Sequence, residues 1–244
     1  MEEMRTIQLD SQVPRARLVI RHLDRIEPAS ADGRAILDLA RAWDGECDVD
    51  SRGCAAYLVF EQTLLRQLFD DDLGPLARDY VGSTESWQAL IAFLDAPEAA
   101  WWDDGATVAR EQAPEILASA LDAAGADLRT ALGDPARWSW GRLHRLNVVE
   151  PTLGTSGIGL LEWYFNQGPV PIAGAAGALN NQYYRQTAAT RTRTTPISSR
   201  STSTACSGCP TDRHCLWAAG GTVALPFSQG AIDRAAVSTL TLAP

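Results

Sequence analysis

The chain has 244 residues, which is enough for one sizeable domain or two small ones. Its formal net charge of −9 argues against nucleic acid or an anionic membrane surface as the main partner. All 21 basic residues are arginine, which suggests a GC-rich genome rather than a nucleic-acid-binding surface. No apolar run reaches the roughly 18 residues that a transmembrane helix needs. The acidic start is also unlike a signal peptide, so we expect none in this chain.

Residues 1–132 have the apolar spacing of a helical region. Ser11 is predicted to cap a helix that has Pro14 in its first turn. A second helix is expected over 31–43, with Gly45 as the left-handed residue that stops it. A third helix is expected to begin after a cap at Ser51. Further helical segments are expected at 73–80, 86–94 and 116–128.

Residues 133–186 predict a strand-rich segment. Trp138 and Trp140 are two positions apart, so in a strand their side chains and that of His144 would share one face. We interpret these three residues as structural, with His144 hydrogen-bonded to a backbone carbonyl. Strands are expected at 143–149 and 160–165.

The composition changes in residues 187–244. Twelve of the 21 residues in 187–207 are Ser or Thr, and none is acidic. A disordered tail is one interpretation. A frameshifted tail is the other, because permitted codons for residues 191–229, read one base earlier, can encode a sequence of alternating strands. We favour the frameshift, beginning after about residue 186.

The tail also contains a set of soft metal ligands, Cys206, Cys209, His214 and Cys215. Zinc prefers such ligands. Their spacing is poor, because adjacent His and Cys residues rarely bind one ion. If these residues nevertheless bind zinc, the alternative function is a non-enzymatic helical binding module with a zinc-stabilised tail.

Other chemistry-bearing residues have structural interpretations. His22 is expected on a helix, and Ser156 is expected in a flexible turn because it does not fit the nucleophile elbow. The acidic clusters at 70–72 and 103–104 lack the ligand spacing of a calcium loop. Cys47 and Cys54 flank a turn and can form a disulfide if the chain is exported. We assign no catalytic, cofactor-binding or metal-ligating residue in this chain.

Two strings in the segment after residue 132 resemble the penicillin acylase family of N-terminal-nucleophile (Ntn) hydrolases. The first is W-x-W-G-x-x-H at 138–144, and the second is G-P-x-P-x-x-G-x-x-G-x-x-N at 168–180. The helical strings at 3–11 and 39–45 are also similar to the family, so the resemblance covers residues 1–185. The signature residues are Trp138, Trp140, Gly141, His144, Gly168, Pro169, Gly174 and Asn180.

The resemblance implies an α+β fold, as the C-terminal part of the large chain of an Ntn-hydrolase αββα sandwich. Helices over 1–132 would be followed by antiparallel strands over 133–186 that return to the sheet. The family cleaves linear amide C–N bonds through an N-terminal serine that forms an acyl-enzyme. Its substrate could be a penicillin, an acyl-homoserine lactone or another acylated amine.

The same resemblance places the catalytic serine, its asparagine and the calcium ligands upstream of this chain. The expected partners are therefore the small chain and the start of the large chain of the same acylase, together with a small amide substrate. The family is typically exported. The chain alone is expected to be inactive.

Overall fold

The computed structural model describes residues 2–181 and 198–199. The chain divides into two compact units. We call Pro14–Gly45 with Ser51–Ser139 the helical unit. We call Met1–Val13 with Glu46–Asp50 and Trp140–Pro244 the signature unit. The tail predicted at 187–244 lies outside the described residues, apart from Ser198 and Ser199.

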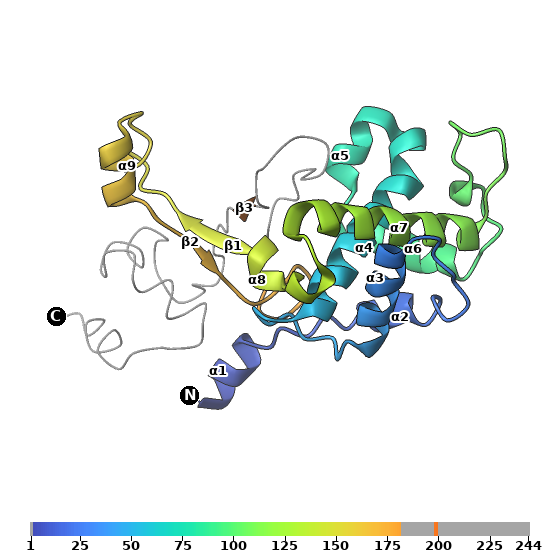
Figure 1. The fold of residues 1–244 in the computed structure, drawn as a ribbon, viewed down its shortest axis with the longest axis horizontal. Helices are drawn as coiled ribbons and strands as arrows, with labels where there is room; N and C mark the ends of the chain where they lie inside the picture. The colour runs from blue at the N-terminus through green and yellow to red at the C-terminus, as the bar shows by residue number, and fades with distance from the viewer. Residues whose placement is uncertain (1, 182–197, 200–244) are drawn as a thin grey trace. The chain divides into compact units, whose positions relative to one another are not determined.

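Three helices form the centre of the helical unit: α3 (Ala31–Ala42), α4 (Arg52–Leu73) and α7 (Ala113–Leu132). They pack against one another in all three pairs (Figure 1). Gly125 permits the close approach of α3 and α7, because a Cβ atom there would lie 2.5 Å from the backbone carbon of Asp32. The buried apolar side chains of the three helices include Ile36, Leu58, Leu65, Leu117 and Leu121.

The ends of these helices follow from side-chain capping. The Ser30 hydroxyl accepts a hydrogen bond from Gly33 N at 2.8 Å, and the Ser51 hydroxyl accepts one from Cys54 N at 3.1 Å. Each bond satisfies an N–H group that has no partner inside its helix. At α7, Gln112 and Glu115 form a reciprocal capping box. The predicted stop at Gly45 was wrong: α3 ends at Ala42 with Trp43 extended as its C-cap, and Gly45, with a positive φ of 97°, turns the chain after the helix has ended.

Shorter elements complete the helical unit. The helices are α2 (Ala16–Ile20), α5 (Ala77–Tyr80) and α6 (Thr84–Leu94), and the 3₁₀ turns are η1 (Gly74–Leu76), η2 (Ala100–Trp102) and η3 (Pro135–Arg137). The helix predicted from Ser11 is shorter than expected. It begins at Ala16, and its N-cap is Arg15 without a side-chain capping bond, so the predicted cap at Ser11 was wrong. Val13, the residue before Pro14, is disfavoured in the helical conformation, which keeps the helix from extending back to Ser11.

The signature unit combines short helices with a small sheet. Its helices are α1 (Glu2–Gln8), α8 (Trp140–Leu143) and α9 (Gly159–Phe165). Strands β1 (Arg145–Val148) and β2 (Gln167–Pro171) pair antiparallel, with an irregularity between Leu146 and Val148. The two-residue strand β3 (Ser198–Ser199) pairs parallel to β1, which gives the order β2-β1-β3. The connection from β1 to β2 carries α9 at the end of the strand pair (Figure 1).

Two strand predictions were wrong. Residues 160–165 lie in helix α9, and the segment 138–144 turns into helix α8 instead of extending. In both cases the aromatic residues suggested strands from local propensity, which packing often overrides. The strand expected at 143–149 exists as β1, two residues shorter at its start.

The described residues are thus mostly helical with a small sheet, which agrees with an α+β class. None of the helices in the described part is long and apolar enough to cross a membrane.

Candidate functional site

The motif residue Trp140 lies at the centre of the signature unit. Its side chain is 1% exposed, and its indole N–H donates a hydrogen bond of 2.8 Å to the carbonyl of Gly174. The ring lies against the imidazole of His144, with 4.8 Å between centroids. Helix α8 therefore joins the first signature string to the second. A buried indole with its N–H satisfied is typical of a packing residue.

Gly141 allows the chain to pass through a crowded position. Its amide donates to the carbonyl of Val49 at 2.7 Å. A Cβ atom at Gly141 would lie 2.5 Å from Val49 Cγ1 and 2.9 Å from Pro171 Cβ. No larger residue fits without a shift of these neighbours, so the glycine of the motif is required by packing.

His144 is fully buried, and two hydrogen bonds, one through its side chain and one through its backbone, join it to Ile172, directly after β2. Its Nδ1 lies 3.2 Å from the carbonyl of Ile172, and the Ile172 amide donates to the His144 carbonyl at 3.2 Å. The predicted bond to a backbone carbonyl is therefore present. Burial lowers the pKa of His144 from 6.5 to about 4, although the Ile172 carbonyl opposes this shift. The ring is thus neutral at neutral pH, with its proton assigned to Nδ1.

The second string bonds to segments that are distant in sequence. Gly174, with a φ of 89°, donates its amide to the carbonyl of Cys47 at 2.8 Å. The Asn180 amide donates to the carbonyl of Asp10 at 2.8 Å, and the Asn180 carbonyl accepts from Ala175 N at 3.3 Å. Asn180 itself is 6% exposed. The motif residues therefore bind the 10–12, 46–50, 140–144 and 171–180 segments together.

The remaining signature residues lie elsewhere. Trp138 belongs to the helical unit, where it is fully buried and donates its indole N–H to the carbonyl of Gly133 at 3.0 Å. The prediction that Trp138, Trp140 and His144 share a strand face was wrong, because the chain turns into α8 between the two tryptophans. Gly168 and Pro169 are in β2, and Pro169 is exposed.

The sequence model of the penicillin amidase family matches residues 1–234. The chain belongs to the penicillin amidase family. It is 34% identical over 152 residues to acyl-homoserine lactone acylase QuiP of Pseudomonas syringae pv. syringae (strain B728a), covering 57% of this chain and 18% of the relative. It is 28% identical over 180 residues to the QuiP of Pseudomonas aeruginosa PAO1, covering 65% and 20%. The chain thus spans about a fifth of the length of these relatives.

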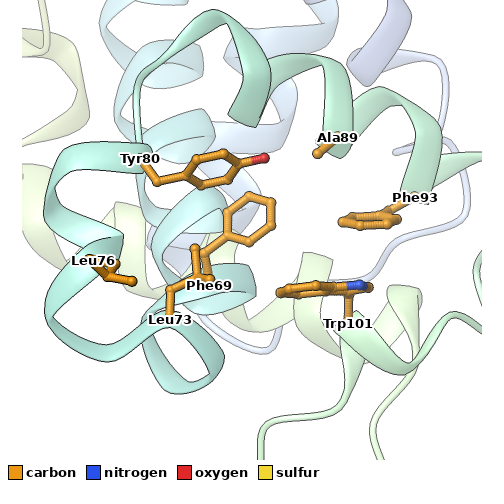
Figure 2. A pocket seen from close by; sticks show the side chains of 7 residues that line it. All are labelled: Phe69, Leu73, Leu76, Tyr80, Ala89, Phe93 and Trp101. Carbon is orange, nitrogen blue, oxygen red and sulfur yellow. The ribbon is translucent and has the colours of Figure 1, made fainter.

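Within this penicillin amidase family member, the helical unit contains an apolar pocket of about 380 Å³. Figure 2 shows its lining side chains, which are Phe69, Leu73, Leu76, Tyr80, Ala89, Phe93 and Trp101. Phe93 stacks on Trp101 with centroids 5.6 Å apart, and Phe69 meets Trp101 edge-on at 5.7 Å. Such walls can hold an apolar group. Apart from the Tyr80 hydroxyl, the lining side chains carry only apolar groups and the indole N–H of Trp101.

The other sequence candidates have structural surroundings. His22 accepts a hydrogen bond of 3.1 Å from Arg21 Nε. Asp71 accepts from Gly105 N at 2.9 Å, and Asp103 accepts from Glu111 N at 3.2 Å, so both shape a loop. Among the residues that the structure describes, no group of three His, Cys, Asp or Glu could hold a metal ion.

The cysteine predictions separate into two sets. Cys47 and Cys54 are fully buried, and both are disulfide-bonded. The four residues of the zinc alternative, Cys206, Cys209, His214 and Cys215, lie outside the described residues.

Sequence reasoning missed a buried charge pair in the helical unit. Arg15 donates to both carboxylate oxygens of Glu61, at 3.1 and 2.9 Å, and the Tyr57 hydroxyl donates to the same carboxylate at 2.7 Å. The Arg15 guanidinium also lies 3.9 Å from the centre of the Trp87 ring. Glu61 is 4% exposed. A charged residue on the apolar face of the helix after Ser51 was the signal in the sequence.

Proposed function

We propose that this chain is the C-terminal scaffold portion of an acylase that hydrolyses the linear amide bond of N-acyl homoserine lactones. The observation that carries the proposal is the match to the penicillin amidase family over residues 1–234, joined by relatives named acyl-homoserine lactone acylase. The geometry of the signature residues is consistent with it. Trp140, Gly141 and His144 are buried and hydrogen-bonded to backbone groups, which supports a packing role.

The proposed reaction is the one that the family resemblance implies. An N-terminal serine, located upstream of this chain, attacks the amide carbonyl, and its own α-amine accepts the hydroxyl proton. Backbone N–H groups and an asparagine side chain stabilise the oxyanion. The C–N bond then breaks, the amine leaves with a proton, and water hydrolyses the acyl-enzyme to the free acid. A calcium ion near that site would also be held by upstream residues.

In this account the present chain acts as a support. Its α8 and its segments at 46–50 and 171–180 would hold strands β1 and β2 in place as part of the Ntn sandwich. The neutral, buried His144 would fix the position of residue 172 instead of transferring protons. We therefore expect the chain by itself to be inactive.

The location of the acylase is part of the proposal. Disulfides form and persist in oxidising compartments and are rare in the cytosol. The disulfide-bonded Cys47 and Cys54 therefore support export of the acylase.

The test is a product assay with N-decanoyl homoserine lactone. The chain alone, and the chain produced together with the polypeptide encoded directly upstream on its genome, would be compared with the P. syringae relative. Amide cleavage releases a free primary amine, whereas opening of the lactone ring does not. We expect amine release from the co-produced pair and none from the chain alone. No amine from the pair, while the relative is active, would overturn the proposal. Release from benzylpenicillin instead would reassign the substrate.

A further inference from the structure

The connection between β1 and β2 presents a cluster of exposed apolar side chains, which we call the arm tip. Trp163 is 77% exposed, Tyr164 is 72% exposed and Leu160 is 73% exposed. The remaining members are Leu153, Ile158 and Phe165. Large apolar residues are common at a protein surface singly, but their gathering within a few residues marks an interaction site.

The arm tip is a built element, held by its own polar groups. One carboxylate oxygen of Glu150 accepts hydrogen bonds from the backbone amides of Thr152 at 3.0 Å, Leu153 and Gly154 at 3.1 Å. Asn166 closes the loop by accepting from Glu150 N at 3.0 Å and donating to the Gly154 carbonyl at 2.8 Å. These hydrogen bonds order the loop that leads into and out of the exposed apolar side chains.

The two carboxylates of the arm tip accept hydrogen bonds from backbone amides of the same loop. Glu162 accepts from Gly157 N at 2.8 Å, and the carboxylate of Glu150 is engaged as described. No basic residue lies in the 150–166 segment, which removes the usual attraction to an anionic membrane. A partner surface that matches the tip is apolar and protein-like.

The area of the arm tip indicates whether its partner is a second copy of this chain or the rest of a larger protein. Trp163 and Tyr164 can each bury about 150–250 Å². These two largest members therefore offer a few hundred Å², and the four smaller side chains of the arm tip add to that area only in part, since Leu153 is only 38% exposed and Phe165 only 37%. A single loop tip of this kind falls short of the ~800 Å² per partner of a stable stand-alone interface. A symmetric dimer through this tip would be too small to persist. The relatives are about five times longer than their matched part, so they have ample further chain to cover such a surface.

We propose that the arm tip docks into an apolar groove on the rest of the acylase, formed by the polypeptide upstream of this chain. The inference rests on the proposed function, since it takes the acylase body as the partner. Docking would bury Leu160, Trp163 and Tyr164 and anchor the β1–β2 pair at its far end. The tip thus acts as an assembly contact and not as a catalytic group.

The test is co-purification of the tagged chain with the upstream polypeptide. The double variant Trp163→Glu/Tyr164→Glu places two charges on the tip, and Val108→Glu changes a fully exposed apolar residue of the helical unit. We expect wild type and Val108→Glu to retain the upstream polypeptide and the double variant to lose at least ten-fold of it. Equal retention by the double variant, or no retention by wild type, would overturn the proposal.

Two further readouts keep the outcomes separate. Circular dichroism should match wild type, and Trp163→Phe/Tyr164→Phe should restore retention; if the charged variant misfolds, Leu160→Ser replaces it. Sedimentation of the chain alone should show a monomer. A dimer that dissociates in the tip variant would instead assign the arm tip to a second copy of this chain. A retained but amide-inactive complex would contradict the proposed function alone. An active complex that is insensitive to the tip variants would contradict the docking alone.

Discussion

The helical unit and the signature unit reach their structures by different routes. In the helical unit, the amphipathic helices α3, α4 and α7 bury apolar faces against one another, and capping side chains close to each helix set its bounds. In the signature unit, backbone amides and carbonyls from segments more than 100 residues apart bond directly, as Gly174 does to Cys47 and Asn180 to Asp10. Packing and backbone hydrogen bonding alone can therefore account for the residues of a family motif in such a unit.

The largest effect on the signature unit is expected from removal of the Trp140 indole. Trp140→Ala should cost roughly 3–5 kcal/mol of stability in the signature unit, as a cavity mutant that also leaves the Gly174 carbonyl without its donor. Hydrogen exchange at the amides of Ile172 and Gly174 should speed up. The helical signal at 222 nm should stay near wild type. Collapse of both units together would contradict their separate construction.

The matching change in the helical unit is Glu61→Ala. Removing one partner of a buried ion pair leaves the charge of Arg15 without the Glu61 carboxylate, which should cost about 3–5 kcal/mol in urea unfolding. Glu98→Ala, at an exposed loop position, is the control and should stay within ~0.5 kcal/mol. A loss below ~1 kcal/mol at Glu61 would mean that the pair adds little to this unit.

The pH dependence of the signature unit should carry the titration of His144. Its pKa is about 4 in the folded state against 6.5 ordinarily, so the unfolded state binds the extra proton between these values. Stability from this group is full above pH ~6.5 and falls by up to about 3 kcal/mol as the pH drops to ~4. Comparing urea midpoints across this window, His144→Gln should show a flatter profile. An unchanged profile would contradict burial of a neutral ring.

A smaller effect is expected at Gly141. Gly141→Ala should cost about 1–3 kcal/mol, because the added methyl group meets Val49 and Pro171. Gly159→Ala is the matched control, since a Cβ atom added at Gly159 would have no neighbour within 4 Å. Thermal unfolding of both variants would measure the difference, and equal stabilities would show that the chain relaxes at Gly141.

The three central helices of the helical unit could be predicted from the sequence because their signals are local. Ser51 caps α4 as predicted, and the apolar stripes of α3, α4 and α7 follow the helical period. The α+β class followed from these and from the family resemblance. The buried Glu61 could be suspected from its place on an apolar face, but its partner Arg15 is 46 positions away and carries no local mark.

The family of the signature unit could be recognised from its sequence, but its helices α8 and α9 could not be predicted from it. The motif identified the family, yet Trp140 begins a helix, and its indole bonds to Gly174, 34 positions later. Residues 160–165 form α9 because Glu150, Glu162 and Asn166 organise the loop around it. Both outcomes depend on long-range or multi-residue contacts, which propensity and period do not encode.

We propose that the signature residues support the acylase without taking part in its chemistry. This is tested by kcat/KM of His144→Gln in an active acylase that contains this segment, corrected for protein yield and checked for self-cleavage. We predict a value within a few-fold of the parent. A loss of several hundred-fold, about 3–4 kcal/mol of transition-state stabilisation, with folding and self-cleavage unchanged, would show that His144 is catalytic.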